Sequence, residues 1–181
     1  MTSRTNIDTS SLTLETFNAM SREQSTEYLL RCCGSTRWAD RMTTSRPFKT
    51  TEDIFSEALR HWHDLETKDW LEAFSHHPRI GDIASMREKY AATAHWATEE
   101  QRGAVGASDE ILHRLAACNA SYEKKFGHIF LVCATGKSAA EMLQILESRM
   151  IHDSTIEMNV AVNEQAKITR LRLEKLFTDE T

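Results

Sequence analysis

The chain has 181 residues, of which 22 are lysine or arginine and 27 aspartate or glutamate, so its formal charge is −5. Its length suits one compact domain, and 40% apolar and 27% charged residues are typical of a globular protein. Six glycines and two prolines are too few for a many-stranded sandwich or barrel. The acidic excess argues against a nucleic-acid partner, and the sequence has neither the apolar run of a membrane span nor that of a secretory signal.

The first half of the sequence predicts a polar tail at residues 1–11, followed by several short helices. Thr13 suits the N-cap of the first helix, and Gly34 is expected to stop the second. Arg46-Pro47-Phe48 breaks the pattern, because the residue before proline avoids the helical region. The predicted helices cover about residues 14–20, 25–33, 38–42, 51–65 and 68–74.

In the second half, Thr98 and Gln101 fit a capping box, and helical spacing covers about residues 111–125. The apolar run 126–134 fits a buried strand or a buried extended segment. Ser138 is expected to cap a helix ending near Met150. The last helix is predicted over 154–177, with its inward side chains at Val160, Ala161, Ile168, Leu171 and Leu176. Residues 12–177 are thus predicted to form an all-α, single-domain bundle of about seven to nine helices, followed by a tail at 178–181.

The cysteines and most histidines predict no metal site. The cysteines lack C-x-x-C spacing, so we expect free, buried thiols and a cytoplasmic protein. His61 and His63 point about 200° apart on a helix, so they cannot share an ion and are expected on its surface. The cysteines in question are Cys32, Cys33, Cys118 and Cys133.

His77 differs from the other histidines because of its neighbours. Pro78 follows it directly, so His77 is expected to present its imidazole from a loop, and Gly81 permits a tight turn or the close approach of a ligand. Histidine is the usual acid/base group near neutral pH. The same Pro and Gly also suit an ordinary exit from a helix, so local chemistry leaves both interpretations open. There is no nucleophile elbow, Walker loop or dinucleotide motif.

Several short motifs, in order, resemble the family of 2-oxo-4-hydroxy-4-carboxy-5-ureidoimidazoline (OHCU) decarboxylases. The segment from His77 to Gly81 resembles the family's HPxxG element. The similarity covers about residues 12–177. The other matching elements are Arg46-Pro47-Phe48, Glu100-Gln101, the Y-x-x-x-F-G stretch from Tyr122 to Gly127, Arg149, and Leu171-Arg172-Leu173.

The resemblance implies an all-α lyase without metal or organic cofactor, usually a homodimer, that converts OHCU to (S)-allantoin in urate and purine breakdown. His77, Glu100 and Arg172 match its catalytic residues, although Arg170 competes with Arg172 for the inward position. Ala97 departs from the serine that many relatives carry there. The resemblance places these residues at the ureido-imidazoline substrate: Pro78, Ala97, Thr98, Glu99, Glu100, Gln101, Phe130, Leu131, Val132, Cys133, Ala134 and Arg172.

Two alternatives to this assignment stay open. The same helical scaffold can serve as a non-catalytic binding or adaptor module, which needs no convergence of His77, Glu100 and Arg172. A related decarboxylase or hydrolase acting on another ureido or purine-derived acid is the second alternative. Turnover of freshly generated OHCU distinguishes the module from an enzyme, and substrate profiling distinguishes the two enzymes.

Overall fold

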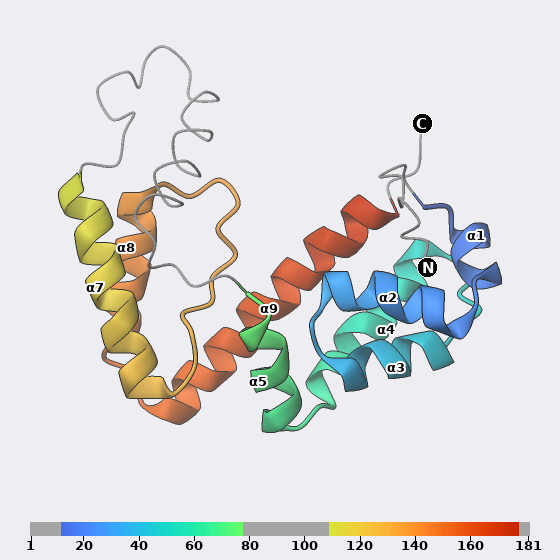
Figure 1. The fold of residues 1–181 in the computed structure, drawn as a ribbon, viewed down its shortest axis with the longest axis horizontal. Coiled ribbons are helices and arrows are strands. Elements are labelled where there is room, and N and C mark those ends of the chain that lie inside the picture. The colour runs from blue at the N-terminus through green and yellow to red at the C-terminus, as the bar shows by residue number, and fades with distance from the viewer. Residues whose placement is uncertain (1–11, 78–108, 178–181) are drawn as a thin grey trace, which may run out of the picture. The chain divides into compact units, whose positions relative to one another are not determined.

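A computed structural model of the chain describes residues 12–77 and 109–177, in which every regular element is an α-helix (Figure 1). These residues form eight helices, which confirms the predicted all-α class of seven to nine helices. The chain divides into two compact units. The first comprises the residues up to Asp69 and from Ile168 onward, and the second runs from Trp70 to Lys167. The first unit is therefore built from both ends of the chain.

Six of the described helices lie within one unit, and the other two each run from one unit into the other. α5 (Thr67–Ser75) crosses from the first unit into the second, and α9 (Ser154–Leu176) returns from the second to the first. None of the described helices is long and apolar enough to cross a membrane. The first unit also holds α1 (Leu14–Ala19), α2 (Arg22–Cys32), α3 (Thr36–Thr44) and α4 (Thr51–His63), and the second also holds α7 (Asp109–Phe126) and α8 (Ala139–Arg149).

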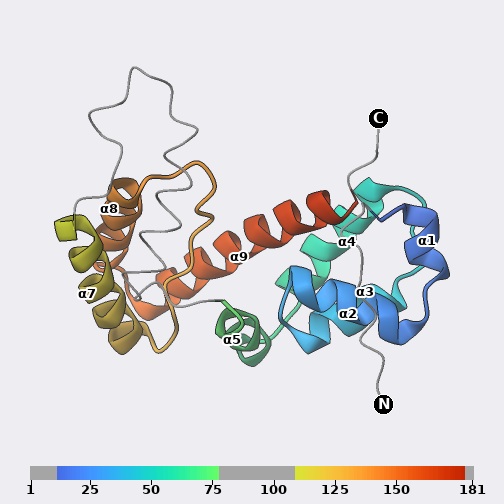
Figure 2. The same ribbon diagram turned by 45° about the horizontal axis from the view of Figure 1, so that its top comes forward.

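Capping side chains fix where helices of the first unit begin. The Thr13 hydroxyl accepts the Thr16 N–H at 3.1 Å, which confirms the predicted N-cap. Ser21 and Gln24 form a capping box, so α2 begins at Arg22, earlier than the predicted start near residue 25. Figure 2 shows α2 next to α3. α2 ends with an extended Cys33 as its C-cap, and Gly34 lacks the left-handed conformation expected of a glycine stop.

Arg46-Pro47-Phe48 joins α3 to α4 and has a structural function in the first unit. The Arg46 guanidinium donates to the carbonyl oxygens of Phe17 and Met20, at 2.8 and 2.9 Å. It thus supplies hydrogen-bond donors to carbonyl groups at the C-terminal end of α1. Asn18 exchanges two hydrogen bonds with the backbone of Phe48. The Phe48 ring is buried and stacks on Phe17, with 6.4 Å between centroids. The motif thus holds α1 in place.

Some predictions about side-chain exposure are wrong. His61 is buried rather than on the helix surface, because it packs beneath the end of α3, where its Nε2 lies 2.9 Å from the Ser45 hydroxyl. All four cysteines are free thiols. Cys32 and Cys33 are buried as predicted, whereas Cys118 and Cys133 are only partly buried. Cys118 packs against the second unit's core.

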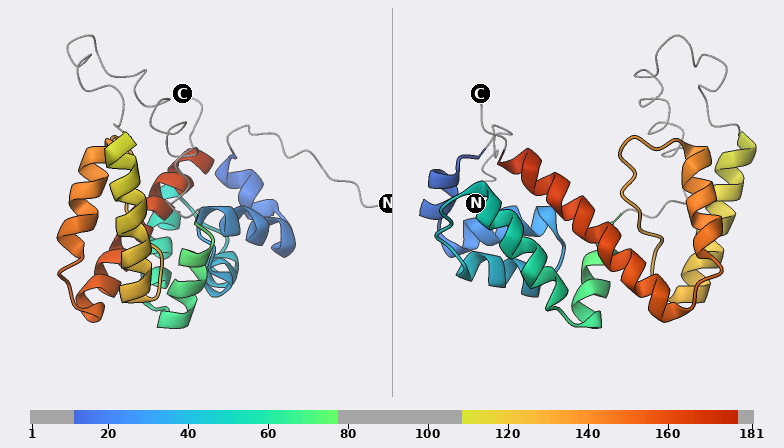
Figure 3. Two further views of the ribbon diagram at one scale, coloured as in Figure 1. Left: turned by 60° about the vertical axis from the view of Figure 1, so that its left-hand side comes forward. Right: turned by 180° about the vertical axis from the view of Figure 1, so that it is seen from behind.

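α7 and α8 lie side by side and enclose the core of the second unit (Figures 1 and 3). Ser138 caps α8 in a capping box with Glu141, which confirms the predicted start of this helix. Phe130, which lies in the connection between α7 and α8, belongs to the same core as Ala139 of α8, so this connection packs against the two helices. The core consists of Leu112, Leu115, Tyr122, Phe130, Ala139, Met142, Leu143 and Leu146.

The buried side of α9 differs from the predicted one. Of the five residues expected to face inward, only Ala161 is fully buried; the other four are partly exposed. Apart from Val162, the buried side chains of α9 instead follow an i, i+4 row, and three of them are polar. Hydrophobic spacing cannot identify such a row, because a buried polar side chain depends on partners elsewhere in the fold. The row consists of Glu157, Ala161, Gln165, Thr169 and Leu173.

Candidate active site

His77 lies directly after α5, in a turn where its N–H donates to the Phe74 carbonyl at 3.1 Å. It therefore leaves the helix as predicted, and its side chain is partly buried. His77 lines a cavity of about 320 Å³ in the second unit. This volume is at the lower end of the range for small-molecule sites. The cavity is lined by Leu71, Phe74, Ser75, His77, Glu123, Gly127, His128 and Ile129.

A second histidine, His128, belongs to the wall of this cavity. Its ring lies between those of Phe74 and Tyr122, with centroids 5.4 and 5.6 Å away. Its Nδ1 donates to the Ile129 carbonyl at 3.0 Å, and Gly127 before it has a φ of +76°, which glycine tolerates. Burial lowers the pKa of His128, so its imidazole is neutral at pH 7. Hydrophobic spacing did not predict a place for His128 in the site. Its position directly after the Y-x-x-x-F-G stretch is the one sequence feature that could have suggested it.

The lowered pKa of His128 predicts that the fold loses stability on acidification. The unfolded chain takes up a proton at this histidine near pH 6.5, before the folded chain does. The contribution is therefore fully present above pH 6.5 and declines as the pH falls below it. We expect the free energy of unfolding, measured in urea at pH 7.5 and pH 5.5, to fall less in His128→Phe than in the wild type. Equal falls in both proteins would contradict the prediction.

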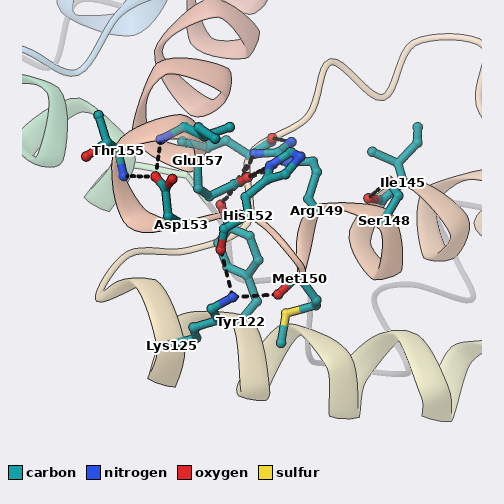
Figure 4. A network of polar contacts seen from close by, with 12 residues as sticks. Tyr122, Lys125, Ile145, Ser148, Arg149, Met150, His152, Asp153, Thr155 and Glu157 are labelled. Atoms are coloured by element: carbon teal, nitrogen blue, oxygen red, sulfur yellow. Dashed lines mark hydrogen bonds and ion pairs between the residues drawn. The ribbon is translucent and has the colours of Figure 1, made fainter.

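Arg149 and Glu157 form a buried ion pair in the second unit (Figure 4). Arg149 Nε donates to Glu157 at 2.8 Å, the Tyr122 hydroxyl donates to the same carboxylate, and His152 Nδ1 contacts it at 2.7 Å. Burial by itself raises the pKa of Glu157. The hydrogen bonds from Arg149, Tyr122 and His152 outweigh burial and leave this pKa below its ordinary value. Glu157 is thus a carboxylate at neutral pH.

Residues 130–134 connect α7 to α8 and form neither helix nor strand, so of the two predicted alternatives the strand is wrong. The carbonyl of Leu131 accepts from Arg149 Nη1 at 2.6 Å, and the N–H of Cys133 donates to Glu164 at 2.7 Å. Lys137 Nζ donates to the Cys133 carbonyl at 2.8 Å. Phe130 and Leu131 are buried, whereas Val132, Cys133 and Ala134 are partly exposed.

The remaining predicted site residues are placed only in part. Arg172 belongs to the first unit, where its Nη1 donates to the Cys32 carbonyl at 3.1 Å. Arg170 is more exposed and lies over the Phe55 ring, 3.6 Å from its centroid. The described ranges contain no cluster of side chains suited to hold a metal ion. Six predicted residues lie outside the described residues: Pro78, Ala97, Thr98, Glu99, Glu100 and Gln101.

In the described residues, fold and site together define a helical protein with a small cavity lined by two histidines, His77 and His128. Residues 18–174 match the family model described as OHCU decarboxylase. The chain belongs to the OHCU decarboxylase family. This agrees with the resemblance carried by the short motifs.

Individual relatives agree with this family. A uric acid degradation bifunctional protein of Arabidopsis thaliana is 39% identical over 149 residues, which cover 82% of this chain and 46% of the relative. This chain thus spans about half the length of that relative. An OHCU decarboxylase of Haloferax volcanii is 27% identical over 78% of this chain and 82% of its own. The crystal structure of an OHCU decarboxylase in the presence of (S)-allantoin is 39% identical, covers 85% of this chain and 99% of the other, and superimposes with a TM-score of 0.71.

Proposed function

We propose that the chain removes CO2 from OHCU and releases (S)-allantoin, as a carboxy-lyase of urate and purine breakdown. The observation that carries this proposal is the likeness to the OHCU decarboxylase solved in the presence of (S)-allantoin, which this chain covers almost completely. The position of His77 on a small cavity in the second unit supports it. The four free thiols support a place in the cytoplasm, where thiols stay reduced.

The substrate's own structure lets the reaction proceed without a metal or organic cofactor. When the bond to the carboxylate breaks, CO2 leaves and the electron pair stays on a ring carbon, where neighbouring carbonyl and imine groups delocalise it. The protein has to orient the carboxylate perpendicular to the ring, stabilise the developing charge and deliver one proton to one face. We assign the proton transfer to His77, whose residue type titrates near neutral pH.

The other roles follow the family resemblance. Glu100 accepts hydrogen bonds from ring or ureido N–H groups, and Arg172 offers a planar, permanently charged fork to the substrate's oxygens. Residues 97–101, Pro78 and the segment 130–134 complete the binding site. The position of Val132 supports a binding role of that segment, because among the described residues neither its N–H nor its C=O has a hydrogen-bond partner.

Assay of freshly generated OHCU tests the function directly. Urate is oxidised and hydrolysed enzymatically to OHCU, and the appearance of (S)-allantoin is followed by circular dichroism with and without the purified chain. We expect rapid, stereospecific formation of (S)-allantoin. Spontaneous decay alone would indicate a binding or adaptor module, and turnover confined to another ureido acid would indicate the related-enzyme alternative.

Substitution of Arg172 by lysine separates its proposed catalytic role from its structural one. Lysine keeps the charge but loses the fork, so we expect kcat/KM for OHCU to fall about 10²-fold, the scale for losing one such donor. Arg170→Lys is the matched control, since Arg170 pairs with the exposed Glu174 on the same helix. If Arg172→Lys lowered only the melting temperature, Arg172 would serve the end of α2 through Cys32 and not the substrate.

We further propose one catalytic domain over residues 12–177 and a homodimer, both as the family resemblance implies. The span of the family match, residues 18–174, supports the domain. The apolar side of α8 is used within the second unit's core, so a dimer contact needs other residues. Ile151 and Ile156 qualify, being 86% and 49% exposed. Sedimentation of the wild type and Ile151→Glu tests whether they contribute.

A further inference from the structure

The segment 130–134 is held by charged side chains in place of a neighbouring strand. Polar groups of a partly buried backbone need hydrogen-bond partners, which a sheet would normally supply. Here Arg149 on α8 binds the Leu131 carbonyl, and Glu164 on α9 binds the Cys133 N–H. Charge-assisted hydrogen bonds of this kind are about twice as strong as neutral ones. Two helices thus fix two successive peptide units.

Both charged groups are themselves held in place. Arg149 is 4% exposed and is fixed by its ion pair with Glu157, and its guanidinium also lies 4.7 Å from the centroid of the Phe130 ring. The Glu164 side chain is 14% exposed and pairs with Lys167 at 2.5 Å. Burial pushes the pKa of Glu164 upward, but the hydrogen bonds from Lys167 and Cys133 outweigh it, so Glu164 is ionised at neutral pH. Neither group has freedom to follow a moving backbone.

Peptide planarity carries this restraint to Val132. In a trans peptide unit, the C=O and the following N–H point in opposite directions, and the peptide bonds of this segment are trans. Because the Leu131 carbonyl points to Arg149, the Val132 N–H points away from it. Because the Cys133 N–H points to Glu164, the Val132 carbonyl points away from Glu164. One donor and one acceptor of Val132 are therefore directed away from the charged groups that hold the segment.

We propose that Arg149 and Glu164 are positioning residues, which act through Leu131 and Cys133 to hold the N–H and C=O of Val132 in a fixed direction for the substrate. A cyclic ureide presents a C=O next to an N–H, which complements one backbone donor and acceptor. The inference rests on the proposed function, because it takes the substrate-binding role of the segment from there. It adds how side chains remote from the substrate set the geometry of that contact.

Glu164→Ala tests the proposal without leaving a buried charge unpaired, because the partner of Glu164, Lys167, is exposed. Alanine is the best helix former, so α9 is expected to persist. The Cys133 N–H loses its acceptor and the segment loosens, so kcat/KM for OHCU is expected to fall 10- to 100-fold, the scale of a misplacement of about 1 Å. Amide hydrogen exchange at Cys133, measured in the substrate-free protein, is expected to accelerate in the same variant because its N–H loses the Glu164 acceptor.

Three further variants make the result specific. Glu164→Gln keeps an acceptor oxygen at the same reach and is expected to restore most of the lost kcat/KM. Glu164→Asp keeps the charge but is one methylene shorter, so it is expected to behave like Glu164→Ala and replaces that variant if alanine impairs folding. Glu147→Ala is the matched control, because it removes a carboxylate of the second unit that, within residues 12–77 and 109–177, pairs only with Arg114 on the surface.

The outcomes separate this proposal from the function on which it rests. Unchanged kcat/KM in Glu164→Ala and Glu164→Asp, with an active wild type, would overturn the positioning role alone. A lower melting temperature with unchanged kcat/KM would do the same and would assign Glu164 to stability only. An inactive wild type would instead overturn the proposed function, while hydrogen exchange would still report whether Glu164 holds the segment.

Discussion

Replacing His77 by asparagine is expected to lower kcat for OHCU by about 10²- to 10⁴-fold, the usual effect of losing an acid/base group. Asparagine can still form hydrogen bonds from a side chain of similar size, but it cannot exchange a proton near neutral pH. His77 follows α5 and contributes no side chain to the buried apolar core, so the fold is expected to persist. Steady-state assay by circular dichroism measures the loss, and the far-ultraviolet spectrum checks the fold.

His76→Asn is the matched control for this experiment. His76 is the neighbouring residue in the same turn, but its side chain is exposed and it does not line the cavity. We expect its kcat and KM to stay within about twofold of the wild type, since surface substitutions rarely have large effects. Wild-type turnover in His77→Asn would remove the histidine from the mechanism and favour another proton donor.

Replacing Glu157 by glutamine is expected to cost the largest share of stability, about 3–5 kcal/mol in the free energy of unfolding. Glutamine has the same shape, but it leaves the Arg149 guanidinium buried without a counter-charge. Tyr122 and His152 also lose their charged acceptor. Urea unfolding at pH 7 followed by circular dichroism measures the change. At acidic pH the difference is expected to shrink, because protonation of Glu157 removes the same charge from the wild type.

A double-mutant cycle distinguishes the ion pair from simple packing. Glu157→Gln combined with Arg149→Met removes both charges, so the double variant is expected to lose less stability than the sum of the two single variants. Glu147→Gln provides the control, because its pair with Arg114 is solvent-exposed and worth no more than about 1 kcal/mol. Strict additivity in the cycle would mean that Arg149 and Glu157 contribute independently.

Local chemistry predicted those features that depend on neighbouring residues. Thr13 and Ser138 were identified as N-caps because a hydroxyl before an apolar helical stripe satisfies N–H groups a few residues later. The exit of His77 from α5 followed from the proline after it. Interactions within about four residues are visible in the sequence itself.

Features that depend on distant partners could not be predicted in this way. The buried row of α9 contains Glu157 and Gln165, which hydrophobic spacing assigns to solvent. Glu157 can be buried only because Arg149, eight residues earlier, and Tyr122, 35 residues earlier, meet it in the fold. The family resemblance located Arg149 and Tyr122 in the correct order but gave neither a structural role.

The division of the chain has a consequence for its synthesis. The first unit needs residues from both ends, since the Leu12 N–H donates to the Leu176 carbonyl at 2.9 Å and the Phe17 ring packs edge-on against Phe177. Residues 70–167 form a continuous stretch of sequence and leave the ribosome earlier than Leu176 and Phe177. The cavity with His77 can therefore form while the chain is still being synthesised, whereas α1 can pack in its final place only after the end of α9 has left the ribosome.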